Sequence, residues 1–337
     1  LDIWFEMPDG WKFEDTHQDL FRLSEYVLLG KQHKHILDGW KPTRKTGRRP
    51  GLAFSGGVDS TAAMCLMPER TVLFYGERDG FETILKHDNA LRFFEHLEKT
   101  SGRSVVRIKS NHELIRTKYG KSPGFSTDYA CAIGAILCAD LFDLDSIGTG
   151  MPLENSYLFH GQVFREFSTS WFWEHYSPLF EKVGLPIYQP VSGCSEIVNA
   201  MIVEKFGFEE YAQSCLRASA GNVCGACWKC FRKNTLNGYD FIFSKEIETF
   251  LEKRPLKMAV STLYMLQRIR EKPIFDEIIN KYPDLQDMLD YDLQWLEKHN
   301  PNALDLLPNQ YREYSTKMLD DCVPRMDPTV LETIDFT

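Results

Sequence analysis

The sequence predicts an α/β protein built on a doubly wound, mainly parallel sheet, with a helical C-terminal region. Three observations carry this prediction. Residues 51–203 alternate short apolar runs with segments of helical period, a glycine-rich turn directly follows the first apolar run, and the pattern beyond residue 239 is helical throughout. Alternation of this kind is typical of parallel strands joined by helices that cover both faces of a sheet.

Five strands and five helices are expected in the main domain. The strands lie at residues 51–54, 71–75, 105–108, 146–149 and 186–191. The helices begin near Ser60, Thr83, Asp128, Arg165 and Ser195. In the second helix, apolar side chains recur at helical spacing: Ile84, Leu91, Phe94 and Leu97. This order of elements indicates a Rossmann-like arrangement.

The 337 residues divide into three parts. At about 150 residues per domain, this length suggests about two domains. Residues 1–50 show no strong period and form an N-terminal extension, whose tryptophans indicate packing on the main domain: Trp4, Trp11 and Trp40. Residues 51–238 form the main domain, which includes a cysteine-rich segment at 215–230. Residues 239–337 form the helical region, punctuated by Pro255, Pro273, Pro283 and Pro301.

The composition excludes several classes of protein and partner. Lys and Arg number 39 against 48 Asp and Glu, a net charge of −9 that disfavours binding to nucleic acid. The most basic run, residues 41–49, is interpreted as a solvated linker. The longest apolar run, residues 129–139, is shorter than the ~18 residues of a membrane-spanning helix, and the N-terminus lacks the pattern of a secretory signal. Nine cysteines, four of them grouped, fit a reducing compartment, so a cytoplasmic protein is expected.

The first strand leads into the segment Ser55-Gly56-Gly57-Val58-Asp59-Ser60-Thr61, which opens the first helix. Two adjacent glycines let the backbone approach a ligand closely, and a helix N-terminus offers free N–H groups and a positive dipole end. Such a turn binds phosphate, with further donors from the hydroxyls of Ser55, Ser60 and Thr61. Asp59 has the wrong charge for a phosphate unless it holds Mg²⁺ or caps the helix. The simpler alternative is a Gly-Gly turn with an aspartate cap.

A second motif is a group of four cysteines, Cys215, Cys224, Cys227 and Cys230, at the spacing C-x8-C-x2-C-x2-C. This spacing lets a short knuckle of chain wrap one tetrahedral ion, and zinc is the expected metal. Four thiolates close the coordination shell, so the zinc would be structural. An iron–sulfur cluster uses the same ligands and stays open as an alternative.

These two motifs, in this order, resemble the QueC family, the 7-cyano-7-deazaguanine (preQ0) synthases among the PP-loop ATP pyrophosphatases. The PP-loop pattern S-G-G-x-D-S is matched at every specified position, and the resemblance covers roughly residues 50–235. Softer similarities are Tyr75–Arg78 to the family's Y-G-Q-R, Arg165–Phe167 to its R-P-E-F, and residues 185–197 to its P-L-x-x-x-x-K-x-E-I segment. The chain departs from the family at residues 123–126, where Pro-Gly-Phe-Ser stands in place of P-x-R-N.

The resemblance implies an ATP-dependent enzyme that adenylates the carboxylate of a 7-carboxy-7-deazaguanine, releasing pyrophosphate. An amine then displaces AMP: ammonia gives the amide and then the nitrile, whereas a protein amine gives a conjugate, as in divergent QueC-like members of antiphage gene clusters. The implied cofactors are ATP, Mg²⁺ and Zn²⁺. The implied catalytic residues are Asp59 and Ser60, the pyrophosphate-binding residues add Ser55, Gly56, Gly57 and Thr61, and the substrate candidates are Arg165 and Glu166.

Other functions stay open at this point. Another PP-loop adenylating enzyme, such as a tRNA-thiolation type, would require a reactive cysteine outside the metal set, either Cys131 or Cys194, and the acidic balance argues against tRNA. A non-catalytic scaffold could retain the loop and the cysteines but has no need of Asp59. In the C-terminal region, the acidic stretch Asp276–Asp292 is expected to help dock a basic acceptor protein, the alternative being helices that only cover the sheet or form a homodimer.

Overall fold

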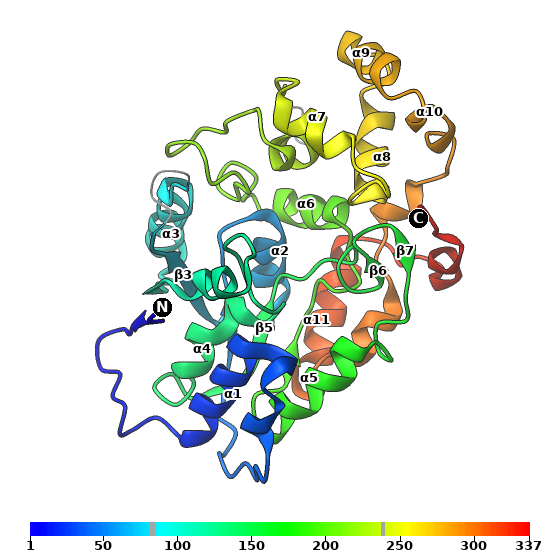
Figure 1. The fold of residues 1–337 in the computed structure, drawn as a ribbon. Helices are drawn as coiled ribbons and strands as arrows, with labels where there is room; N and C mark the ends of the chain where they lie inside the picture. The colour runs from blue at the N-terminus through cyan, green and yellow to red at the C-terminus, as the bar shows by residue number, and fades with distance from the viewer. Residues whose placement is uncertain (81–84, 237–239) are drawn as a thin grey trace.

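The computed structural model describes residues 1–80, 85–236 and 240–337, and its centre is a six-stranded sheet (Figure 1). The strand order is β1-β4-β3-β2-β5-β8, and only β1 runs antiparallel to its neighbour. The strands are β1 (Phe5–Glu6), β2 (Arg49–Ala53), β3 (Val72–Arg78), β4 (Val105–Ser110), β5 (Leu144–Thr149) and β8 (Ile187–Tyr188). All five predicted parallel strands are therefore present, within a few residues of their expected bounds.

The chain starts the parallel sheet in its middle, at β2, builds outward through β3 and β4, and returns to add β5 and β8 on the other side. Leu52 pairs in register with Leu73 of β3 and with Gly148 of β5. The strand order therefore reverses between β2 and β5. In doubly wound sheets, ligands bind outside the carboxyl ends of the strands at this switch point.

Helices cover both faces of the sheet, and the alternation of side chains along β3 shows why. Val72 and Phe74 face one apolar core, formed with α1 (Gln18–Leu29), α4 (Ile133–Leu137) and α5 (Trp171–Lys182). Leu73 and Tyr75 face the other, formed with α2 (Val58–Leu66), α3 (Asp88–Ser101), α6 (Glu196–Lys205) and α11 (Asn309–Cys322). Since both faces are buried, the strands are nearly continuous apolar runs.

The N-terminal residues contribute to the main sheet rather than standing apart from it. Phe5 of β1 pairs with Ser110 of β4, and the indole N–H of Trp11 donates to the Leu137 carbonyl at 2.9 Å. Helix α1 packs on α4 and fully buries Leu20 and Leu23. The sequence reading missed this helix.

Two predicted helix starts need comment. The start expected near Thr83 lies outside the described residues, and α3 begins at Asp88. The helix expected near Arg165 begins only at Trp171, because Ser170 caps it by accepting from the Trp173 amide at 3.2 Å. Arg165 instead follows a short hairpin of β6 (Leu158–Phe159) and β7 (Val163–Phe164).

The C-terminal region is helical, as predicted, and returns to the sheet. Its α-helices are α7 (Lys245–Leu251), α8 (Ala259–Arg268), α9 (Pro273–Lys281), α10 (Leu285–Met288) and α11. On α11, the Tyr311 hydroxyl donates to Asp145 Oδ2 at 2.5 Å, and Ser315 lies 2.6 Å from the Tyr188 hydroxyl. The short turns of helix are η1 (Gly30–Leu37), η2 (His112–Tyr119), η3 (Ala130–Ala132), η4 (Cys230–Asn234), η5 (Gln294–Glu297), η6 (Pro301–Leu306) and η7 (Pro328–Thr333). Among the described residues, no helix is long and apolar enough to cross a membrane.

Candidate nucleotide site and metal centre

The segment Ser55–Thr61 forms a loop between β2 and α2, at the carboxyl edge of the sheet and at its switch point. Gly56 has a φ of +71°, a left-handed conformation that a side chain would strain. The hydroxyls of Ser55 and Ser60 lie 3.0 Å apart, and Ser60 Oγ donates to the Gly57 carbonyl at 3.1 Å. Within the described part of the chain, the amides of Asp59 and Ser60 find no hydrogen-bond acceptor. The loop therefore has the features of an anion site at a helix N-terminus.

A second strand end approaches the loop closely. Gly150 follows β5, and a Cβ at this position would lie only 2.7 Å from the Ser60 nitrogen. Only glycine lets the two backbones meet at this distance. The ends of β2 and β5 therefore form one edge, as the switch point requires.

Asp59 lies in the first turn of α2, and both of its carboxylate oxygens are engaged. Oδ1 accepts from the Asn199 side chain at 3.0 Å, and Oδ2 lies 2.6 Å from Lys233 Nζ. The same ammonium lies 3.4 Å from Glu196 Oε1. Burial lowers the pKa of Lys233, but the charges of Asp59 and Glu196 outweigh burial and leave that pKa raised. Lys233 is thus a buried cation held at the loop.

Behind Asp59, a chain of buried polar groups links the loop to the C-terminal region. Arg232, only 2 % exposed, donates to Glu196 Oε2. Glu154 is fully buried, and its Oε1 accepts from the Glu196 amide at 3.0 Å and from the Ser261 hydroxyl at 2.5 Å. Burial first, and then the charge of Glu196, raises the pKa of Glu154 to about 7. The network joins α2, α6, η4 and α8.

Two further cations lie near Asp59. Burial, followed by the charges of Lys233 and Arg78, lowers the pKa of Lys229 to about 8, while Asp59 opposes the shift. Arg78 ends β3, and its Nε lies 2.6 Å from Glu113 Oε1. Arg78 and Lys233 are thus paired with carboxylates, whereas Lys229 has no ion-pair partner among the described residues. The Lys229 ammonium can therefore pair with an anionic ligand.

Asp128 lies farther along the same edge, just before η3. Its carboxylate is exposed and makes no hydrogen bond or ion pair within the described residues. Partial desolvation by neighbouring groups raises its pKa, while the charges of Arg165 and His160 oppose that shift. Cys131 lies beside it, with its thiol facing the Asp128 carbonyl at 3.7 Å. Asp128 is thus an open carboxylate flanked by cationic groups.

The two substrate candidates from the sequence separate in the structure. Arg165 lies near Asp128 and is fixed by donating to the Ser156 carbonyl at 2.5 Å, with its guanidinium 5.7 Å from the Phe159 ring. Glu166 instead accepts from the amide and the hydroxyl of Ser168, which makes it part of the turn before α5. Of the two candidates, Arg165 is therefore the one that lies near Asp128.

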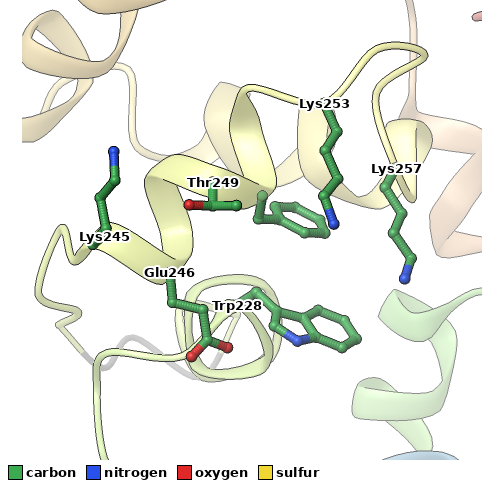
Figure 2. A pocket seen from close by; sticks show the side chains of 7 residues that line it. Trp228, Lys245, Glu246, Thr249, Lys253 and Lys257 are labelled. Carbon is green, nitrogen blue, oxygen red and sulfur yellow. The ribbon is translucent and has the colours of Figure 1, made fainter. Parts of the chain in front are cut away.

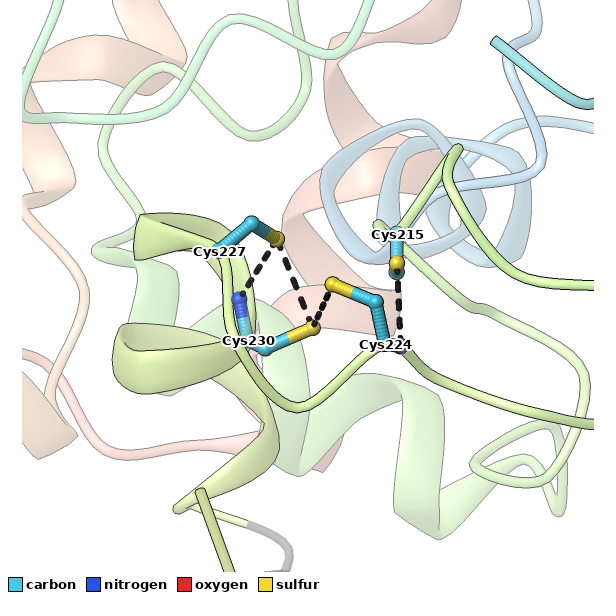
Figure 3. A group of neighbouring side chains, drawn as sticks. All are labelled: Cys215, Cys224, Cys227 and Cys230. Carbon is cyan, nitrogen blue, oxygen red and sulfur yellow. Dashed lines mark hydrogen bonds between the residues drawn. The ribbon is translucent and has the colours of Figure 1, made fainter. Parts of the chain in front are cut away.

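The four cysteines converge on one point (Figure 3). Their Sγ atoms all lie within 4.8 Å of one another, with Cys227 and Cys230 at 3.4 Å and Cys224 and Cys230 at 3.7 Å. The Cys224 amide points at Cys215 Sγ and the Cys230 amide at Cys227 Sγ, each at 3.4 Å. Such N–H···S contacts stabilise thiolate ligands. The group can therefore hold a metal ion.

Residues on both sides of the cysteine motif in the sequence contact the Ser55–Thr61 loop or the first turn of α2. Ser214, just before Cys215, accepts a hydrogen bond from the Val58 amide at 3.4 Å. Arg232 and Lys233 lie two and three residues after Cys230, in the turn η4. The sequence reading missed these two cations and their partners, although their place immediately after the cysteine motif was a usable signal.

The cysteines considered for thiol chemistry differ in access. Cys194 is fully buried, and burial raises the pKa of its thiol. Cys131 is half-buried, and burial together with Asp128 raises the pKa of its thiol to about 12. Reactive cysteines have lowered pKa values, so neither thiol is activated by its surroundings.

The acidic stretch of the C-terminal region is partly neutralised within the chain. Asp284 pairs with Arg254, whose Nε lies 2.5 Å away, and Asp290 lies 3.7 Å from Arg270. Docking of a basic partner at this stretch stays a prediction.

Comparisons with known proteins give limited matches. A model described as a family of unknown function (DUF6395) matches residues 175–333. No curated protein matches the chain. A solved structure, the U34-tRNA thiolase NcsA from Methanococcus maripaludis with its [4Fe-4S] cluster, is 12 % identical, with a TM-score of 0.29, over 82 % of this chain and 81 % of that chain. The matched family segment includes all four cysteines and excludes the loop at residues 55–61.

Proposed function

We propose that the chain is an ATP-dependent, QueC-like enzyme that adenylates the carboxylate of a 7-carboxy-7-deazaguanine and passes the acyl group to an amine. The observation that carries the proposal is the Ser55–Thr61 loop at the switch point of a parallel sheet, with Lys233 and Lys229 beside it. Free amides and buried cations at this place suit a departing pyrophosphate.

In the proposed reaction, a carboxylate oxygen attacks the α-phosphorus of ATP, and the bond to the bridging oxygen breaks to release pyrophosphate. The amine then attacks the acyl carbon, AMP leaves, and the amine loses a proton. The loop amides and Lys233 would stabilise the negative charge that accumulates on the pyrophosphate, and the site would act chiefly by positioning. Ammonia would give the amide and, after loss of water, the nitrile, whereas a protein amine would give a conjugate.

The role proposed for Asp59 follows from its contacts. Its oxygens accept from Asn199 and Lys233, and the Lys233 ammonium already neutralises the charge that would otherwise hold a Mg²⁺ ion. We assign Asp59 instead to positioning Lys233 at the loop. Ser60 would contribute its backbone amide to the anion site, and its hydroxyl donates to the Gly57 carbonyl.

The exposed carboxylate of Asp128 favours a guanine-like substrate in this proposal. Guanine presents an N–H and an amino group on one edge, and a carboxylate accepts from such donors. Asp128 is open and without a hydrogen bond among the described residues, and Arg165 lies next to it. We therefore assign Asp128 to the donor edge of the deazaguanine and Arg165 to holding Asp128 ionised.

The metal is proposed to be a structural Zn²⁺ held by the four cysteines. With Zn–S bonds of ~2.3 Å, a tetrahedral site has sulfur–sulfur edges of roughly 3.8 Å, close to the spacing found. The ligand sulfurs of an iron–sulfur cube lie outside four iron atoms and must be farther apart. The tight group, within 4.8 Å, favours the single ion.

The test is ATP–pyrophosphate exchange measured on the pure protein with and without 7-carboxy-7-deazaguanine. We expect exchange only with the acid, and AMP with pyrophosphate as the products of turnover. Asp59→Asn should lower exchange by ~10² or more, since it loosens Lys233. Asp321→Asn, an exposed aspartate that also pairs with a lysine, is the control and should exchange normally. Release of ADP and orthophosphate would contradict the proposal.

A tRNA-thiolation activity is the second candidate, because Cys131 lies beside Asp128. Both reactions adenylate their substrate first, so the exchange reaction does not need the thiol, whereas the transfer of sulfur through Cys131 does. Cys131→Ser therefore separates the two by product formation: a variant that still turns over the deazaguanine acid supports the adenylation of a carboxylate, and one that keeps exchange but forms no product supports thiol chemistry.

A further inference from the structure

A separate hollow of about 420 Å³ lies between the cysteine knuckle and α7 (Figure 2). It is lined by residues of α7, of the segment between α7 and α8, and of the knuckle: Trp228, Lys245, Glu246, Thr249, Phe250, Lys253 and Lys257. Lys253 and Lys257 extend in the same direction, toward the side on which Trp228 lies, whereas Lys245 extends the opposite way.

The charges of this hollow are unbalanced. Lys245 pairs with Glu248 at 3.1 Å, and Glu246 pairs with Arg217. Lys253 and Lys257 are exposed and have no carboxylate partner in the part of the chain that the structure describes. The hollow therefore presents two uncompensated ammonium groups.

The wall of the hollow is aromatic. The rings of Trp228 and Phe250 stack at 5.6 Å with an angle of 11°, and Lys257 Nζ lies 5.6 Å from the Trp228 ring. Arg232 approaches the same ring at 4.6 Å from inside the molecule. An apolar side chain can pack on this wall while neighbouring carboxylates reach the lysines.

The hollow is joined to the loop and to Asp128 by short steps. Trp228 precedes Lys229, whose ammonium interacts with Asp59. On the other side, Lys257 interacts with His160, and His160 with Asp128. A chain bound in the hollow would therefore lie near the candidate nucleotide site.

We propose that this hollow docks an acidic polypeptide segment that carries an apolar side chain. The identification of that polypeptide as the amine-bearing acceptor rests on the proposed function, but the binding itself does not. Two separated ammonium groups on an exposed rim match carboxylates spaced along an extended chain. A nucleotide is disfavoured because the described residues that line the hollow include no glycine turn, and the carboxylate of Glu246 lies at its edge.

The experiment is direct binding to the full chain, without ATP, of a short fluorescein-labelled peptide of alternating Glu and Phe. We expect saturable anisotropy that weakens as salt is raised. Lys253→Ala together with Lys257→Ala should weaken binding about tenfold, because each exposed charge pair contributes modestly. Lys245→Ala, whose side chain points away, is the matched control and should bind as the wild type does. Thermal unfolding of each variant checks that the fold is kept.

Three results would overturn the inference. The first is that a peptide with Gln in place of Glu binds equally well. The second is that the double alanine variant binds the Glu peptide normally. The third is that inorganic triphosphate competes at a lower concentration than the unlabelled Glu peptide. The outcome is separable from the enzyme proposal. If the wild type binds the peptide but shows no ATP–pyrophosphate exchange, the docking site is kept and the proposed function is rejected. If it shows exchange but does not bind the peptide, the proposed function is kept and the docking site is rejected.

Discussion

The two sides of the candidate site, the loop with Asp59 and the segment with Asp128, are built differently. Around Asp59, the charges are buried and paired with one another: Asp59 with Lys233 and Glu196 with Arg232. Asp128, by contrast, is exposed and makes no hydrogen bond within the described residues. Charges that pair with one another are held in place before any ligand binds. The exposed Asp128 carboxylate, in contrast, takes its hydrogen-bond donors from the ligand. The loop side should therefore control stability and phosphate chemistry, and the Asp128 side should control the choice of substrate.

The largest expected effect comes from the metal, because the knuckle carries Lys229 and Lys233 to the loop side. Cys227→Ser should lose the ion and unfold the knuckle, since a structural zinc contributes on the order of 10 kcal/mol to local folding. Elemental analysis should find one zinc per chain in the wild type and little in the variant. Cys131→Ser, on the Asp128 side, should keep its zinc. Iron with a visible absorption band would contradict the zinc assignment.

The ion pair at Asp59 gives the next largest effect. Lys233→Met leaves Asp59 and Glu196 without their shared cation, and breaking a buried pair in this way costs ~3–5 kcal/mol. Denaturant unfolding should show this loss, with exchange activity lost as well. Lys317→Met removes an exposed lysine that also pairs with an aspartate, and should change stability by less than ~1 kcal/mol. Equal effects of the two variants would remove the distinction between buried and exposed pairs.

The pH dependence of stability tests the network behind the loop. Burial and Glu196 raise the pKa of Glu154 from 4.5 to about 7, so the folded chain keeps a proton that the unfolded chain has released. Stability should therefore fall as the pH rises from about 4.5 to about 7, by up to ~3 kcal/mol from this group. Glu154→Gln should flatten that decline in unfolding experiments across the pH range. An unchanged decline would show that Glu154 does not hold the proton.

The smallest effect on stability is expected at Asp128. Asp128→Asn breaks no hydrogen bond within the described residues, so the free energy of unfolding should change by less than ~0.5 kcal/mol. The KM for the deazaguanine acid should nevertheless rise at least ~10-fold, because an amide presents an N–H to the substrate's donors. The KM for ATP should stay the same. A variant that binds the acid normally would show that this side does not select the substrate.

What the sequence could predict depends on whether the signal is local or comes from distant parts of the chain. The parallel strands follow from apolar runs, and the convergence of the four cysteines follows from their local spacing, because both signals lie within short stretches of chain. The partners of Asp59 could not be predicted, since Asn199 and Lys233 lie 140 and 174 residues away and only the tertiary fold brings them together. Arg165 was expected in a helix, but the cap at Ser170 delays α5 and leaves Arg165 in a loop.

The most direct measurement of the central claim is the fate of the carboxylate oxygen. 7-Carboxy-7-deazaguanine labelled with ¹⁸O in its carboxylate is incubated with the protein, ATP and an amine donor, and the nucleotide products are weighed by mass spectrometry. If the carboxylate attacks the α-phosphorus, one ¹⁸O atom appears in AMP, and pyrophosphate carries none. Label absent from AMP during turnover, or ATP cleaved to ADP, would contradict acyl adenylation at this site.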